Sequence, residues 1–353
     1  MRYVFAEAQL RHRPPTFLVR GQPKPSPEKA ERAEALVGSL RARGVTVEEP
    51  PSYGAGPRAA VHSADYLRFL ETAYARWSAL PDASEVIVPN IHRNTDMAEY
   101  PTGIVGQAGW HMSDTACPIG ADTWEAVCGG ADTAAHAALM VASGQERAAY
   151  ALCRPPGHHA SRDMAGGFCY INNAAVAAQA MLPVLGQRGR APRVAVFDVD
   201  VHHGNGTQAI FYDRDDVLFV SIHGDPNNFY PWFAGYAHER GKGRGLGSNL
   251  NIPLPMGTEE STFLNAVDEA LAQIAAFGPE ALVLSLGFDT YAGDPLAFFK
   301  VTTPGFATLG RKIAGAGLPT VLVQEGGYDC GALAVNLASF LDGFEGGLAE
   351  AGR

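Results

Sequence analysis

The sequence predicts a single α/β domain in which helices flank a central, mainly parallel β-sheet. Short runs of Val, Leu, Ala and Phe recur along the chain, and such near-continuous apolar runs are typical of parallel strands buried on both faces. Amphipathic stretches of helical length separate these runs, which is the pattern of β–α alternation. No internal repeat or low-complexity linker interrupts the 353 residues, so we expect one domain over residues 1–353.

Each expected element follows from this pattern. The apolar runs predict strands at Arg2–Ala6, Ala149–Cys153, Val194–Val199, Val217–Ile222, Ala281–Leu286 and Thr320–Val323. The amphipathic stretches predict helices at Glu28–Arg43, Ala64–Leu80, Asp122–Ser143, Asn173–Gly186, Glu259–Phe277 and Pro304–Ala316. Ser26 and Pro27 suit the N-cap and first turn of the first helix, and Ser63 suits the N-cap of the second.

The segment from about residue 81 to 120, called the arm below, departs from the pattern. It has prolines at positions 81, 89, 101 and 118 and little periodicity. So long an irregular stretch inside a compact domain is usually functional or packed against a partner.

Composition argues against several classes of partner. The net charge of −10 disfavours nucleic acid, because phosphates require a basic surface. No apolar run approaches the roughly 20 residues that span a bilayer, so no membrane partner is expected. The five cysteines form no CxxC pair, which favours reduced thiols and a cytoplasmic location.

The strongest chemical motif is DVDVHHGNG at residues 198–206, directly after a predicted strand. Asp200 and His202 offer one carboxylate oxygen and one imidazole nitrogen to a common centre, and both are suitable zinc ligands. Asp289 follows another predicted strand and is a candidate third ligand, which would leave a position open for a water. Carboxylates at strand ends can instead cap helices or pair with arginine, but two clusters on separate strands favour a metal.

Three further motifs follow predicted strands or lie near their ends. RPPGHHA at residues 154–160 places His158 and His159 after a rigid turn, which favours acid–base chemistry over a structural role. EGGY at residues 325–328 ends in Tyr328, whose hydroxyl could donate to a developing oxyanion. GGFCYINN at residues 166–173 contains Phe168, which either lines a substrate channel or packs in the core.

Together these segments resemble the histone deacetylase family within the arginase/deacetylase superfamily. The resemblance covers nearly the whole chain, with RPPGHHA, GFCYINN, DVDVHHGNGTQ, SIHGDP, GFDTYAGDPL and EGGY in order. It implies a three-layer arginase/deacetylase fold and a zinc-dependent deacetylase that hydrolyses linear amides. It also implies one zinc ion per chain held by Asp200, His202 and Asp289, with Tyr328 as the oxyanion donor.

The resemblance assigns roles to the histidine pair as well. His159 matches the general base and acid, and His158 matches its electrostatic partner, which Asp198 would orient. Asn205 stands where many relatives have an aspartate beside the second histidine. Because a neutral amide raises the pKa of a histidine less than a carboxylate does, we expect His159 to be more readily neutral here.

The resemblance further implies a structural potassium ion and a set of substrate-binding residues. The potassium ligands would be Asp198, Asp200, His202, Ser221 and Ile222, largely through backbone carbonyls. The substrate-binding set would be Gly167, Phe168, Tyr230, Asp114 and Leu296. The two-metal arginase branch requires further carboxylates at the positions that Gly204 and Tyr291 occupy here, so one metal is favoured over two.

Within the family, the residue sequences of these motifs are most similar to those of bacterial acetylpolyamine amidohydrolases. That similarity implies a small acetylated amine as substrate and a homodimer formed through the arm. The similarity also implies two acidic side chains in the arm that meet a distal ammonium, and here Asp114 stands at one of these positions and Val105 at the other, with Glu99 or Asp96 as candidates to compensate. The alternative is a protein acetyl-lysine deacetylase. A catalytically silent binding protein is disfavoured, because every ligand and catalytic residue is present.

Overall fold

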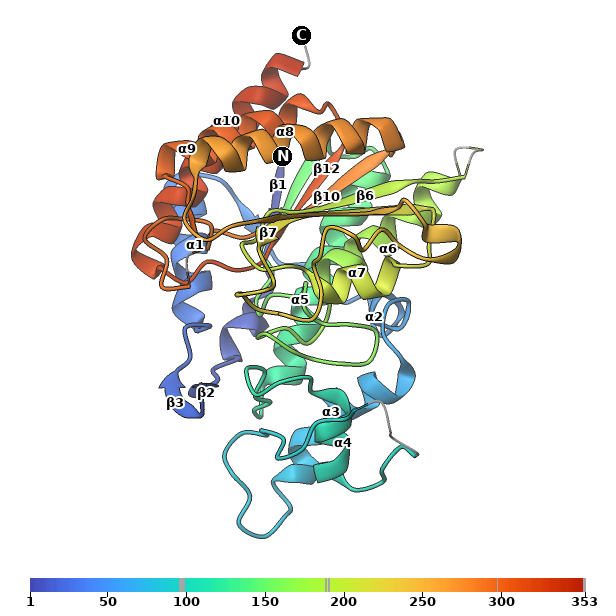
Figure 1. The fold of residues 1–353 in the computed structure, drawn as a ribbon, viewed down its shortest axis with the longest axis vertical. Helices are drawn as coiled ribbons and strands as arrows, with labels where there is room; N and C mark the ends of the chain where they lie inside the picture. Colours follow the sequence, from blue (N-terminus) through green and yellow to red (C-terminus); the bar gives the residue numbers. More distant parts are fainter. Residues whose placement is uncertain (95–98, 188, 190, 297, 352–353) are drawn as a thin grey trace.

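A single parallel sheet forms the centre of the molecule (Figure 1). The computed structural model describes residues 1–94, 99–187, 189, 191–296 and 298–351, so Asp96 lies outside the described residues. Within them the sheet has eight strands in the order β4-β1-β5-β12-β10-β6-β7-β8, and every neighbouring pair is parallel. The strands are β1 (Arg2–Val4), β4 (Val47–Glu48), β5 (Ala148–Ala151), β6 (Val194–Asp198), β7 (Val217–Gly224), β8 (Asn249–Leu254), β10 (Ala281–Leu286) and β12 (Thr320–Gln324). The predicted fold class is confirmed, and all six predicted strands are present.

Helices cover both faces of the sheet, which gives three layers (Figure 1). The helices are α1 (Ala30–Ala42), α2 (Gly56–Ala59), α3 (Ala64–Trp77), α4 (Ile104–His111), α5 (Thr123–Ala142), α6 (Asn173–Gly186), α7 (Asn205–Phe211), α8 (Glu260–Phe277), α9 (Thr303–Gly315) and α10 (Cys330–Ala351). Because side chains alternate along a strand, Val194 and Val196 pack with α5 and α6, whereas Ala195 and Phe197 pack with the layer of α1, α8, α9 and α10. The two hydrophobic cores therefore lie on opposite faces of one sheet.

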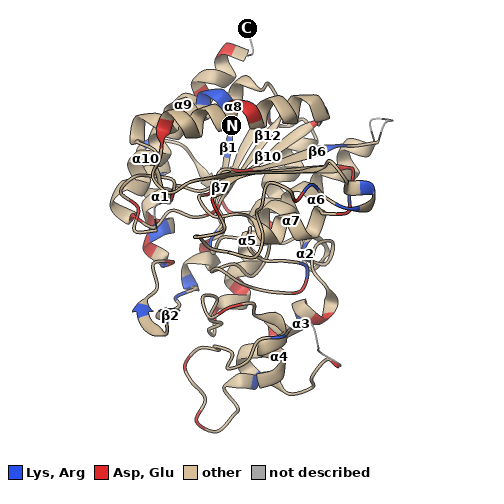
Figure 2. Ribbon diagram, in the orientation of Figure 1, with Lys and Arg blue, Asp and Glu red and all other residues tan. Residues whose placement is uncertain are grey.

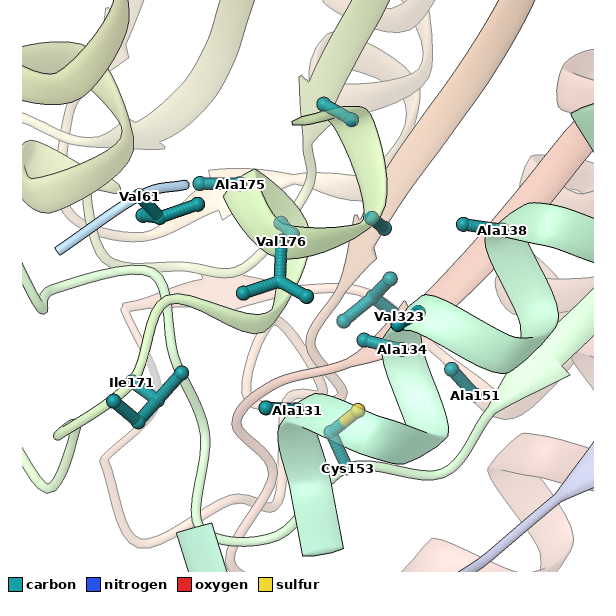
Figure 3. Close-up of a cluster of buried hydrophobic side chains, with 14 of the residues drawn as sticks. Val61, Ala131, Ala134, Ala138, Ala151, Cys153, Ile171, Ala175, Val176 and Val323 are labelled. Carbon is teal, nitrogen blue, oxygen red and sulfur yellow. The ribbon is translucent and has the colours of Figure 1, made fainter. Parts of the chain in front are cut away.

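Small residues bring α5 and α6 close to the sheet (Figure 3). The buried side chains shown there include Ala131, Ala134 and Ala138 of α5, Ala175 of α6 and Val323 of β12. Because a methyl group is all that separates these helices from their neighbours, any larger side chain at such a position would overpack the core.

The first helix begins later than predicted. Its N-cap is Lys29, which makes no side-chain capping bond, and the Ser26 hydroxyl donates to the Glu28 carbonyl instead. The Glu28 side chain is fully buried and is engaged by arginines, as described below. The cap at Ser63 is confirmed, since its hydroxyl accepts from the Tyr66 amide.

The arm is not irregular throughout, because it contains α4. Gly106 and Gly109 weaken the helical pattern in the sequence, yet a side chain at Gly109 would collide with the Ile91 carbonyl. The arm is also tied to the 163–167 turn of the same chain. The Ser113 amide donates to the Ala165 carbonyl at 2.8 Å, and the Ala165 amide donates back to the arm at 2.8 Å.

The five cysteines are unpaired, as predicted from their spacing. Among the helices described, none is both long and apolar enough to cross a membrane.

Two buried histidines predict a loss of stability in acid. Burial lowers the pKa of both His12 and His62 to about 4. The Nε2 atom of His62 accepts from the Asn172 amide at 3.0 Å, so this ring must be unprotonated at that nitrogen. Because the unfolded chain takes up these protons near pH 6.5, stability is complete above that pH and falls as the pH drops towards 4, by roughly 3 kcal/mol for each histidine. Urea unfolding between pH 7.5 and 4.5 measures this slope.

The variant His62→Gln should flatten the slope, and the matched change at the exposed His238 should not. An unchanged slope in His62→Gln would remove His62 from this account.

Candidate active site

Four neighbouring strands bring the predicted catalytic and metal-binding residues to one edge of the sheet. The segments that follow β5, β12, β10 and β6 carry the RPPGHHA, EGGY, GFDTYAGDPL and DVDVHHGNGTQ motifs, respectively. These strands are adjacent and parallel, so their carboxyl ends lie together. Ligands of open α/β sheets bind beyond these ends.

The three predicted metal ligands form one buried cluster. Ligand atoms of Asp200, His202 and Asp289 all lie within 4.8 Å of one another. The His202 Nδ1 atom is 3.1 Å from Asp200 Oδ1 and 3.2 Å from Asp289 Oδ2. Burial and the charge of Asp200 raise the pKa of Asp289 to about 7. Two carboxylates and an imidazole crowded in this way suit a divalent cation such as zinc.

Two glycines leave the space that these carboxylates occupy. A side chain at Gly326 would collide with the carboxylate oxygens of Asp289 and Asp200, and one at Gly287 would collide with Asp200. The Gly326 amide also donates to Asp200 Oδ2 at 2.8 Å. Gly326 of the EGGY motif therefore lets the backbone approach both carboxylates closely.

The two histidines lie beside this cluster with different partners. His158 Nδ1 is 2.9 Å from Asp198 Oδ2, and His159 Nδ1 is 2.8 Å from Asn205 Oδ1. The two ring centroids are 4.0 Å apart. Since an amide oxygen can only accept, Nδ1 of His159 carries its proton and Nε2 keeps a lone pair.

Their environments push the two pKa values apart. Burial lowers the pKa of His158, but the charges of Asp198 and Asp200 outweigh it and raise the value to about 10. Burial and the positive charge of His158 hold the pKa of His159 well below its usual range. This direction agrees with the neutral His159 that Asn205 led us to expect.

Tyr328 is buried, and both its backbone and its ring are fixed. Its amide donates to Asp294 Oδ2 at 2.6 Å, and the Arg32 guanidinium lies 4.7 Å from the ring centroid. The ring meets Phe168 edge to face at 5.7 Å. Burial raises the pKa of the phenol well above 10, so the hydroxyl stays protonated and can donate.

Two of the predicted substrate-binding residues, Tyr230 and Gly167, are hydrogen-bonded to Asp114. Its Oδ2 atom accepts from the Tyr230 hydroxyl at 2.6 Å and from the Gly167 amide at 3.0 Å. The Tyr230 ring packs edge to face on His159 at 4.8 Å. Leu296 lies on the turn where its amide donates to Asp294 Oδ1 at 2.9 Å.

The predicted potassium ligands are also buried together. The register of β6 and β7 pairs Asp198 with Ser221, and Ile222 follows in the same strand. The Ser221 hydroxyl lies 2.8 Å from His223 Nδ1, so its side chain already has a partner.

A buried charge cluster that no sequence pattern predicts lies next to the Tyr328 turn. The Glu28 carboxylate lies 2.9 Å from Arg32 Nη1 and 2.9 Å from Arg154 Nε, and all three side chains are buried. Arg32 also donates to the carbonyls of Gly327 and Glu325, which directly precede Tyr328. Glu28 and Arg32 are four residues apart in a stretch that the sequence pattern predicts to be helical, where such a pair is normally a surface pair, so the sequence provided no signal.

Glu325 links the two catalytic turns. Its Oε2 atom accepts from the Gly157 and His158 amides at 2.7 and 3.1 Å. The histidine turn and the tyrosine turn are therefore joined by one buried carboxyl group.

Replacing Glu28 should destabilise the protein strongly. In Glu28→Gln the guanidinium groups of Arg32 and Arg154 lose their buried counter-charge, which typically costs about 3–5 kcal/mol. Urea unfolding measures the loss. The exposed ion pair of Glu259 with Lys300 provides the control, since Glu259→Gln should cost less than about 1 kcal/mol. Equal losses in the two variants would contradict the expected difference.

The histone deacetylase domain matches residues 26–344 of the chain. The chain belongs to the histone deacetylase family and is an enzyme that hydrolyses amides. Within the family, it is 50% identical over 341 residues to an acetylpolyamine amidohydrolase of Burkholderia pseudomallei, covering 96% of this chain and 97% of that one. It is 44% identical over 347 residues to an acetylpolyamine amidohydrolase of Mycoplana ramosa, covering 98% and 100%.

A solved structure agrees with these relatives. The crystal structure of an acetylpolyamine aminohydrolase from Burkholderia pseudomallei superimposes with a TM-score of 0.93 at 50% identity, covering 98% of this chain and 99% of that one. The predicted family and the predicted three-layer arginase/deacetylase fold are thereby confirmed.

Proposed function

We propose that the chain is a zinc-dependent amidohydrolase that removes the acetyl group from a small cationic amine such as an acetylpolyamine. The observation that carries this proposal is the buried cluster of Asp200, His202 and Asp289, with the His158–His159 pair directly beside it. The names of the relatives, which are acetylpolyamine amidohydrolases, supply the substrate class.

The donor set fits one metal ion per chain. One ion would be held by two carboxylates and an imidazole, and Gly204 and Tyr291 supply no carboxylate for a second. When bound, zinc supplies Lewis acidity, which polarises a carbonyl oxygen and lowers the pKa of a water.

The side chains of this chain then divide the proton transfers between them. His159 takes a proton from the attacking water on its free Nε2 atom and afterwards gives a proton to the leaving amine. His158 remains a cation beside it, held by Asp198. Tyr328 donates its hydroxyl proton in a hydrogen bond to the oxyanion that develops from the acetyl carbonyl.

We propose that Phe168 and Tyr230 line the two sides of the acetamide chain, with Gly167 between them. Asp114 supplies negative charge near this lining, and Leu296 contacts the substrate from the Tyr328 side. A structural potassium ion bound by Asp198, Asp200, His202, Ser221 and Ile222, a homodimer formed through the arm and a cytoplasmic location complete the proposal.

Turnover of a substrate series by zinc-loaded protein tests the proposal. The series sets acetylputrescine and acetylcadaverine against an acetyl-lysine peptide and an acetylated folded protein. Hydrolysis of the acetylated amines, with no release of acetate from the folded protein, is the expected result. Efficient hydrolysis of the folded protein would favour the protein deacetylase alternative, and no hydrolysis of any amide would overturn the proposal.

A further inference from the structure

Two rows of aromatic side chains lead from the catalytic groups towards the surface. In the first row, the Tyr328 ring contacts Phe168 at 5.7 Å between centroids, and Phe168 contacts Phe17 at 5.4 Å. Tyr328 is buried, whereas Phe17 is partly exposed on the strand β2 (Thr16–Val19). The first row therefore connects the oxyanion donor to an N-terminal hairpin.

The second row begins at the general base. The His159 ring contacts Tyr230 at 4.8 Å, and Tyr230 contacts Trp232 at 5.4 Å. Trp232 is 50% exposed, so this row also reaches the surface. The two rows meet at Gly167, where a side chain would come within 2.8 Å of the Tyr230 hydroxyl. A substrate that reaches the catalytic groups along these rows lies against aromatic surface.

The Asp114 carboxylate, which is hydrogen-bonded to this lining, has few acceptor sites left for a further donor. Asp114 accepts from the Tyr230 hydroxyl, the Gly167 amide and the Ala116 amide. An ionised carboxylate has about four acceptor sites, so Asp114 can accept roughly one more donor. It can therefore receive one ammonium group but not several.

The hairpin at the outer end of the first row is basic. The strands β2 and β3 (Gln22–Pro25) pair antiparallel, with Phe17 directly opposite Lys24, so the two side chains share a face. Residues 16–25 of the hairpin contain Arg20 and Lys24 and no Asp or Glu, whereas Arg11 and Arg13, which precede it, are paired with Glu125 and Glu34. Figure 2 shows blue residues on this hairpin. The distal ammonium of a polycation would meet an apolar ring and like charges there.

We propose that this lining selects acetylated amines that carry an apolar segment next to the acetamide and no more than one cationic group. Phe17 and Lys24 are the specificity-determining residues on the hairpin side, and Asp114 is the one on the arm side. This inference rests on the proposed deacetylase function and narrows its substrate class from polyamines in general to monocationic or neutral acylamines.

Three substrates that share the acetamide group and differ in distal charge test the proposed selectivity. We compare kcat/KM for acetylcadaverine, which carries one distal charge, for N-pentylacetamide, which carries none, and for acetylspermidine, which carries two. Acetylcadaverine should be best and N-pentylacetamide within about 10-fold of it, because one close ion pair contributes on the order of 1 kcal/mol. Acetylspermidine should be at least about 10-fold poorer than acetylcadaverine, because its second charge meets the basic hairpin.

Equal or better turnover of acetylspermidine would overturn the selection while leaving the deacetylase function intact. Absence of turnover on all three would overturn the deacetylase function itself.

A pair of charge insertions tests the hairpin directly. Phe17→Glu places a carboxylate on the face shared with Lys24, whereas Leu18→Glu places the same charge one residue along β2, on the opposite face. Phe17→Glu should raise kcat/KM for acetylspermidine relative to N-pentylacetamide by about 10-fold, and added salt should reduce this gain. Leu18→Glu should change the ratio by less than about 2-fold. The same change in both variants would show a general charge effect and would remove Phe17 from the account.

The variant Asp114→Asn tests the arm side. The amide oxygen can still accept from Tyr230 and Gly167, so the contacts with the lining are kept, whereas the hydrogen bond from the Ala116 amide is lost together with the charge. Its KM should rise by a larger factor for acetylcadaverine than for N-pentylacetamide. Equal rises for both substrates would show that Asp114 acts only through the shape of the lining.

Discussion

Tyr328→Phe is expected to lower kcat by about 10²–10³-fold, the range found when one oxyanion donor is removed from an amide-hydrolysing site. The substitution deletes one oxygen and keeps the ring, so the contacts with Phe168 and the Arg32 guanidinium should remain. Steady-state kinetics on acetylcadaverine with zinc-loaded protein measures the loss.

Metal content and thermal midpoint separate a chemical role from a structural one. Both should match the wild-type values in Tyr328→Phe, because the hydroxyl is not among the clustered metal-ligating groups. A variant with full turnover would exclude Tyr328 as the oxyanion donor. A variant that lost its zinc would show that the tyrosine supports the metal cluster instead.

Asp289→Ala is expected to abolish both metal binding and turnover. Residues that merely support a metal ligand reduce affinity by about 10–100-fold when replaced, so loss of a ligand should exceed that range. Zinc content after dialysis, measured by elemental analysis, should fall from one ion per chain to near zero. Turnover should fall with it and should not recover fully when zinc is added.

The fold must be checked in the same variant, since Asp289 Oδ1 also accepts from the Val201 amide at 2.9 Å. Asp289→Asn can keep that hydrogen bond and provides the second variant. Asp268→Ala, at an exposed ion pair with Lys312, provides the control and should retain zinc. If Asp289→Ala bound zinc as tightly as the control, the assigned ligand set would be wrong.

The centre of the sheet was predictable because burial on both faces leaves little choice of residue. The strands β6 and β10 are fully buried and are uninterrupted apolar runs up to Asp198 and Ser285. The edge strands were missed for the opposite reason. β4 has two residues and is half-exposed, and β8 includes Asn249, Asn251 and Pro253, so neither has a clear apolar pattern.

The last helix, α10, was missed because of its glycines. Gly343 and Gly347 lower helical propensity, which masks the pattern in the sequence. In the structure they allow α10 to approach α9, because a side chain at Gly343 would collide with the Ala307 carbonyl and one at Gly347 would crowd Ala314. Tertiary packing decides these positions, and local pattern cannot reveal it.

The candidate site was predictable where chemistry dictates residue type and spacing, as at Asp200 and His202. The residues that pack around the site were not predictable from the sequence. Glu28 and Arg32 lie about 300 residues before the Tyr328 turn that Arg32 holds, and only the folded chain brings them together. The hydrogen bond from Tyr230 to Asp114 likewise joins residues 116 positions apart.

The glycines behind the metal cluster determine how this enzyme can be altered. Gly204, Gly287 and Gly326 each leave no space for a methyl group beside Asp198, Asp200 or Asp289. A saturation-mutagenesis survey should find these three positions almost entirely intolerant, even to alanine. The exposed hairpin around Phe17 faces no such restriction. Directed evolution towards new amides should therefore leave the reacting centre fixed and diversify the hairpin, where substitutions can change substrate choice without loss of the catalyst.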